Sequence, residues 1–110
     1  MNRYDVAELA EDAVALHPTR PAMTLAHDSA DARLIVFRIK PGQQVPSHTS
    51  TSTVILSVVA GEGVVSGGEG EMPVSMGDVI AFSPNEPHGM RAVHNELVLL
   101  ATITPRPGTR

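Results

Sequence analysis

The chain has 110 residues, a formal net charge of −4 and no cysteine. This length suits one domain with a modest core and is too short for two. The acidic balance and the absence of any lysine/arginine cluster argue against a nucleic-acid partner, and without cysteine neither disulfides nor thiolate chemistry is available.

The N-terminal sequence MNRYDVAELAEDAV is acidic and lacks the basic and then apolar pattern of a secretory signal. The longest apolar runs have the length of strands rather than of membrane spans. We therefore expect a cytoplasmic protein with no membrane partner. Nine glycines and nine prolines lie between short β-branched runs, which favours an all-β barrel or sandwich.

Residues 5–16 have apolar side chains at helical spacing, and Asp5 with Glu8 resembles a capping box. The pattern predicts a short helix, which the prolines at positions 18 and 21 would end. A strand is expected at residues 23–27 and a turn at 28–31. Residues 33–40 then alternate and predict a half-buried strand that ends at Pro41-Gly42.

Residues 41–61 read PGQQVPSHTSTSTVILSVVAG, which is typical of a turn, an extended segment, a buried strand and another turn. In an extended chain every second side chain shares a face. One face would then carry the following residues: His48, Ser50, Ser52, Val54, Leu56 and Val58. A histidine on that face would look into whatever the face encloses.

Gly61 and the glycines at 67–70 read as hairpin turns, with a return strand beginning at residue 63. An edge strand is expected at 72–76 because of Pro73, and a compact buried strand at 79–82. The loop 83–87 would deliver His88, and strands at 90–93 and 97–104 would follow. The last strand is apolar on both faces, which implies that one face packs in the core and the other is covered.

With Val54 and its alternate neighbours inward, Ile55 and Val59 point outward beside one face of residues 97–103. Together these side chains would form an exposed apolar patch, and such patches usually mark an interface. We therefore expect a homodimer that packs sheet against sheet.

Two stretches, Gly42 to Gly61 and GDVIAFSPNEPH from Gly77 to His88, resemble the two motifs of the cupin family of small β-barrels. Gly42, His48 and Gly61 match the first motif in register, and Gly77, Asp78, Pro87 and His88 match the second. The resemblance implies an all-β double-stranded β-helix, a jelly-roll-like barrel, as a single domain over residues 1–110. Its core would span 33–104, preceded over 1–30 by an N-terminal arm or short helix, since similar chains often begin with an extended arm.

The resemblance also implies a metal set of three histidines and one glutamate, at positions that are His48, Ser50, Val54 and His88 here. Only His48 and His88 retain a ligating side chain. A divalent transition metal such as zinc, iron, nickel or manganese would need a third protein ligand from elsewhere, for which Glu86, His94 and His27 are the available residues.

Three interpretations of the two histidines stay open. They can hold a metal in a cupin enzyme of oxygenase or isomerase type, or they can orient a small molecule in a metal-free pocket, or they can be structural. We expect the second, with no tightly bound cofactor. The pocket would be lined by His48, Ser50, Val54, Phe82, His88 and Met90. No pattern identifies a catalytic residue, and a sensor without catalysis is a further alternative.

Overall fold

The computed structural model describes residues 1–107. One helix and eight strands follow in order: α1 (Val6–Asp12), β1 (Ala22–Asp28), β2 (Arg33–Ile39), β3 (Gln44–His48), β4 (Thr53–Gly67), β5 (Gly70–Ser75), β6 (Val79–Phe82), β7 (His88–Arg91) and β8 (Leu97–Thr104). Within residues 1–107, no helix is long and apolar enough to cross a membrane.

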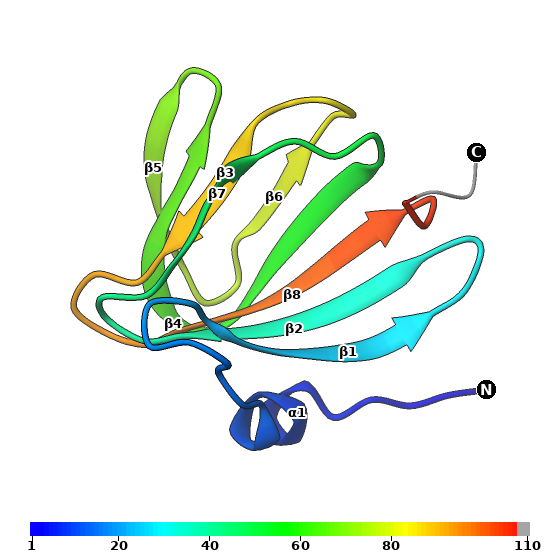
Figure 1. The fold of residues 1–110 in the computed structure, drawn as a ribbon, viewed down its shortest axis with the longest axis horizontal. Helices are drawn as coiled ribbons and strands as arrows, with labels where there is room; N and C mark the ends of the chain where they lie inside the picture. Colours follow the sequence, from blue (N-terminus) through cyan, green and yellow to red (C-terminus); the bar gives the residue numbers. More distant parts are fainter. Residues whose placement is uncertain (108–110) are drawn as a thin grey trace.

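The strands form two antiparallel sheets that share β4. The first half of β4 pairs with β6 and with β8, which continues through β2 to β1. The second half of β4 pairs with β5 and with β7, which continues to β3. Figure 1 shows the two sheets facing each other, with β1, β2 and β8 on one side and β3 and β7 on the other. This is the predicted all-β double-stranded β-helix.

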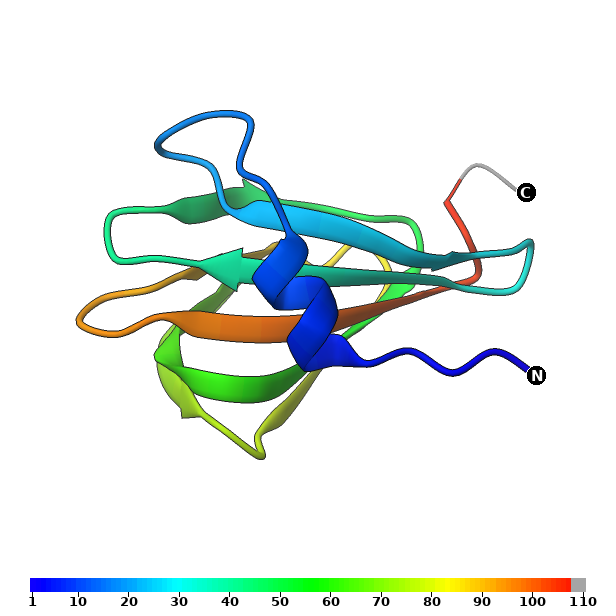
Figure 2. The ribbon, with the colours of Figure 1, turned by 90° about the horizontal axis from the view of Figure 1, so that it is seen from below.

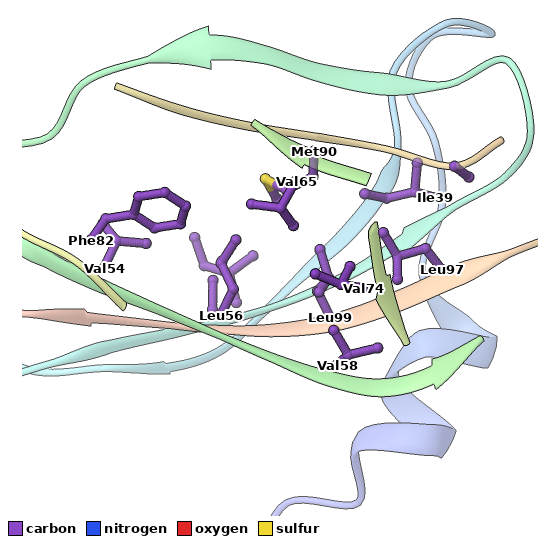
Figure 3. Close-up of a cluster of buried hydrophobic side chains, with 13 residues drawn as sticks. Ile39, Val54, Leu56, Val58, Val65, Val74, Phe82, Met90, Leu97 and Leu99 are labelled. Atoms are coloured by element: carbon purple, nitrogen blue, oxygen red, sulfur yellow. The ribbon is translucent and has the colours of Figure 1, made fainter. Parts of the chain in front are cut away.

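The core fills the space between the sheets. Figure 3 shows aliphatic side chains from both sheets meeting there with one aromatic ring, Phe82. The largest side chains that are fully buried include Ile39, Leu56, Leu97 and Leu99. Burying each of them stabilises the fold by roughly 1.5–3 kcal/mol, so the closed sheet is held mainly by this cluster.

Helix α1 confirms the predicted helix, and its start is capped as the sequence suggests. The Glu8 backbone N–H donates to Asp5 Oδ1 at 3.1 Å. The helix ends earlier than the apolar spacing indicates, because Ala13 is already extended and Val14 forms a bridge with Met23.

Helix α1 covers the outer face of the first sheet, as Figure 2 shows. Ala10 packs there with Val36 and Val98, and Val59 and Leu100 pack against the same cluster. Two predictions are corrected by this contact. The outer face of β2 is covered at Val36, which is fully buried, while Leu34 and Arg38 on the same face are half-buried. Val59 is not part of an exposed patch. The sequence also predicted that the second face of the last strand would be covered, and helix α1 provides that cover.

The stretch after Pro41 also differs from its prediction. The chain does not run extended from His48 to Val58, because β3 ends at His48 and β4 begins at Thr53. Nor does a hairpin form at Gly61: β4 is one strand of 15 residues that bends there and passes from one sheet into the other. Gly61 has a φ of +76°, and a Cβ at this position would overlap the Glu96 carbonyl oxygen. The glycine therefore serves a close approach of two backbones.

The compact strand predicted at 79–82 has the right bounds, but most of it is not buried. β6 pairs only with β4 among the described strands, so it lies at an edge. Val79 is 65% exposed, whereas Phe82 points into the core and is 4% exposed. β5 likewise pairs only with β4 in the described chain, which agrees with the edge position expected from Pro73.

Candidate functional site

The two motif histidines are direct cross-strand partners. His48 is the last residue of β3 and His88 the first of β7, and the two strands pair antiparallel with these residues opposite each other. Their ring centroids lie 4.2 Å apart, with an angle of 61° between the ring planes. The sheet therefore brings the two imidazoles into contact at one end of the barrel.

Each ring is held by the backbone two residues before it. His48 Nδ1 lies 3.0 Å from the Pro46 carbonyl oxygen, and His88 Nδ1 lies 3.1 Å from that of Glu86. A carbonyl oxygen can only accept a hydrogen bond, so Nδ1 must carry the proton on both rings. In the neutral state each Nε2 then has a free lone pair.

The two histidines differ in their surroundings. His48 is exposed, whereas His88 is buried, with 3% of its surface exposed. Burial lowers the pKa of His88 below its ordinary value; the hydrogen bond to Glu86 opposes this effect and the nearby His48 adds to it. The Phe82 ring lies against His88 with a centroid distance of 5.1 Å. His88 is therefore predominantly neutral at pH 7.

Two loops fix this end of the barrel. The Asn85 backbone N–H donates to the Ser50 carbonyl at 2.7 Å, which ties the loop before β7 to the loop before β4. Within the first of these loops the Glu86 carboxylate accepts from the Ser83 N–H at 3.0 Å. In the second, the Ser52 N–H donates to Ser50 Oγ at 3.1 Å. The two loops position His88 and Ser50 together.

A cavity of about 360 Å³ opens beside the two histidines. Apolar residues form most of its wall: Phe37, Val45, Val54, Leu56, Met90, Ala101, Ile103 and Pro107. Polar residues gather at one end: His48, Thr49, Ser50, Thr51 and His88. No lysine, arginine, aspartate or glutamate is among the described residues that line it.

Five of the six residues predicted for the pocket line this cavity, namely His48, Ser50, Val54, His88 and Met90. Phe82 does not line it; this residue supports His88 from within the core. Phe37 and Ile103 were not predicted as pocket residues. The inward face of the alternating segment 33–40 is the signal that indicates Phe37, since it shares that face with Ile35 and Ile39.

None of the residues considered as a third metal ligand joins the pair. The Glu86 carboxylate binds its own loop, and His27 is hydrogen-bonded to the Tyr4 hydroxyl at 2.9 Å. His94 is exposed in the turn before β8. Within residues 1–107, no three histidine, cysteine, aspartate or glutamate side chains form a group that could hold a metal ion.

The cupin domain family matches residues 35–104, which is more than half of the chain and spans β2 to β8. The chain belongs to the cupin family. The expected resemblance is thus confirmed, and both histidines lie within the matched region of this cupin. No curated protein matches the chain.

Solved structures agree with this fold. TT1209 from Thermus thermophilus superposes with a TM-score of 0.85 at 26% identity, covering 97% of this cupin and 100% of that chain. An RmlC-like cupin protein from Desulfovibrio desulfuricans has a TM-score of 0.74 at 33% identity, covering 86% and 91%. A predicted oxalate decarboxylase from Thermotoga maritima has a TM-score of 0.73 at 24% identity, covering 78% and 81%, and shows the fold alone.

Proposed function

We propose that this cupin binds a small molecule in the cavity beside His48 and His88, without a resident metal. The observation that carries the proposal is the composition of the wall, which is apolar except for a polar end with two imidazoles in contact. Small-molecule sites usually combine an apolar lining with a few convergent polar groups.

The size of the cavity supports a ligand of about one ring. Ligand sites typically occupy roughly 300–1,000 Å³, and the cavity of about 360 Å³ lies at the lower end of that range. An apolar cavity of about 150 Å³ accommodates benzene. A substituted six-membered ring or a short branched chain, somewhat larger than benzene, would therefore fit in this space.

The family's metal set does not fit the residues present. Ser50 and Val54 stand at two of its four positions, a hydroxyl is a poor ligand and valine has no donor. A catalytic metal usually takes three protein ligands. One observation does favour a metal, because histidine ligands commonly donate their second ring nitrogen to a backbone carbonyl, as both rings do here. Two nitrogens alone still leave the set one ligand short.

Elemental analysis separates these two candidates. Protein purified without chelator or affinity metal should contain far less than one equivalent of any transition metal. About one equivalent, lost in a His48→Phe variant and retained in a His94→Phe variant, would overturn the metal-free proposal. The second variant is a matched control because His94 is an exposed histidine outside the cavity.

Ligand binding is tested by screening a metabolite library for compounds that raise the melting temperature, followed by calorimetry on each hit. A ligand at 100 times its Kd stabilises the folded state by about 2.7 kcal/mol. We expect hits whose affinity falls in His48→Phe and is unchanged in His94→Phe. A library of ring-sized metabolites without a single saturable hit would contradict the proposal.

We also propose that the protein is a homodimer, although through another surface than the sequence indicates. The outer sheet face is partly covered by α1, whereas apolar side chains are exposed beside the edge strand β1. Val14, Leu16 and Met23 are 70%, 97% and 51% exposed and line a groove of about 510 Å³. Burying such a surface against a second copy removes apolar area from water. A monomer in sedimentation equilibrium at micromolar concentration would contradict this proposal.

A further inference from the structure

We propose that the polar end of the cavity selects uncharged ligands that donate hydrogen bonds, such as phenols and other ring-sized alcohols, over carboxylates. This inference rests on the proposed function and adds the class of ligand. Three features support it: the nitrogen atoms of the two histidines that make no hydrogen bond within the protein, the absence of charge in the lining, and the extent of the apolar wall.

The ring nitrogens decide which hydrogen bonds the histidine pair can make with a ligand. A neutral imidazole has one donor and one acceptor. In both His48 and His88 the donor is used, because Nδ1–H bonds to a backbone carbonyl. The Nε2 lone pair remains at each ring. Among residues 1–107, neither Nε2 has a hydrogen-bond partner. The pair therefore offers two acceptors to an incoming molecule and, while neutral, no N–H donor.

The cavity wall lacks the groups that would stabilise an anionic ligand. A carboxylate that leaves water needs a cation or several strong donors to offset its lost hydration. The described cavity wall contains no lysine or arginine, and its imidazoles present lone pairs that would repel a carboxylate oxygen. The hydroxyls of Thr49, Ser50 and Thr51 can donate or accept and therefore do not reverse this preference. A ligand hydroxyl, in contrast, can donate to an imidazole nitrogen, and no charge has to leave water when it binds.

The apolar part of the wall suits a ligand whose body is a hydrocarbon. The apolar wall, which includes Val54, Leu56 and Ile103, lines the same cavity as the polar residues. An aromatic or aliphatic ring would pack on the wall while its hydroxyl reaches an imidazole. The inferred ligand is thus a single ring or a short branched chain with one or two hydroxyl groups.

The test uses three probes of similar size: phenol as donor, toluene without a polar group, and benzoate as anion. Their dissociation constants are measured by ligand-observed NMR at pH 8, where imidazoles with an ordinary pKa near 6.5 are neutral. The protein is the full chain, freed of metal with chelator and checked by elemental analysis. His48→Phe removes one acceptor while keeping an aromatic ring at an exposed position, and His94→Phe is the control.

We expect benzoate to bind at least about tenfold more weakly than phenol, since its charge is uncompensated. The His48→Phe change should weaken phenol about fivefold, the worth of one neutral hydrogen bond, and leave toluene unchanged. His94→Phe should alter none of the three.

Benzoate binding as tightly as phenol would overturn this inference and leave the proposed function standing. The same holds if phenol keeps its affinity both in His48→Phe and in His88→Phe, because neither imidazole would then be the acceptor. If none of the three probes binds at millimolar concentration, both the inference and the proposed pocket fail, so the two failures can be told apart.

Discussion

Replacing Gly89 by alanine should separate the two strands that carry the histidines. Gly89 follows His88 in β7 and is buried between β3 and β4. A Cβ at this position would lie 2.8 Å from Ser66 Oγ, 3.0 Å from the Val45 carbonyl oxygen and 3.1 Å from the Ser47 nitrogen. Two of these atoms belong to the backbone of β3, which cannot yield without moving His48.

The size of the effect follows from two terms. Adding a methyl group to a well-packed interior costs about 1–3 kcal/mol, while replacing glycine by alanine in regular structure gains about 0.5–1 kcal/mol from the unfolded chain. Gly68 provides the control, since a Cβ there would meet only Pro87 Cδ at 3.7 Å, an ordinary contact. The unfolded-state gain is similar for both glycines. The difference between the variants therefore isolates the strain at Gly89.

Urea unfolding of Gly89→Ala and Gly68→Ala measures this difference directly. We expect Gly89→Ala to be less stable than Gly68→Ala by about 1–3 kcal/mol, with unchanged denaturant dependence. Phenol should also bind Gly89→Ala more weakly than Gly68→Ala, because the imidazole pair is displaced. Equal stability of the two variants within about 0.5 kcal/mol would refute the close packing of β3, β4 and β7 on which the site depends.

Three further predictions concern stability. Replacing Leu99, which is fully buried in the core, by alanine should lower the free energy of unfolding by about 2–5 kcal/mol. A loss below about 1 kcal/mol in urea unfolding would show a more loosely packed core. Ser52→Ala should cost about 1–3 kcal/mol because the buried Ser52 hydroxyl donates to the Pro105 carbonyl, whereas Thr51→Ala, at an exposed position, should be near neutral. Because the pKa of His88 lies below 6.5 in the folded protein, the unfolded chain takes up this proton first. The stability that neutral His88 contributes is fully present above pH 6.5 and is lost as the pH falls through its folded-state pKa, with a slope of at most about 1.4 kcal/mol per pH unit. Urea midpoints measured between pH 8 and 5 should therefore fall less in His88→Gln than in the unchanged protein. An equal fall in both proteins would count against this role of His88.

The positions of most strands along the chain could be predicted because the relevant signals are local. Alternation and the Pro41-Gly42 turn predict a strand at 33–40, which the structure has at Arg33–Ile39, and the apolar run at 97–104 predicts the last strand. Asp5 marks the start of the helix. The signal at Gly61 is ambiguous by nature, since a glycine with positive φ serves a hairpin and a close backbone approach equally well. Only the neighbouring backbone of Glu96 decides between them, and that contact is not local in sequence.

For the candidate site, no spacing rule brings His48 and His88 together; the resemblance to cupins indicates it, and the pairing of β3 with β7 provides it. Burial of Val36 under the helix could not be predicted, because the alternation of its strand indicates one buried face and not what covers the other. The tautomer of each ring depends on the carbonyl two residues earlier, which is a matter of backbone geometry. The chemistry of the acceptor pair is therefore visible only in the structure.

The acceptor pair of His48 and His88 can be observed directly by nitrogen NMR of the imidazole rings in histidine-labelled, metal-free protein at pH 8, with His48→Phe and His88→Gln spectra to assign the signals. We predict that both rings carry their proton on Nδ1 and that both Nε2 resonances shift when phenol is added. Protons on Nε2 in both rings, or Nε2 resonances that do not shift at a saturating ligand concentration, would contradict the proposed acceptor pair.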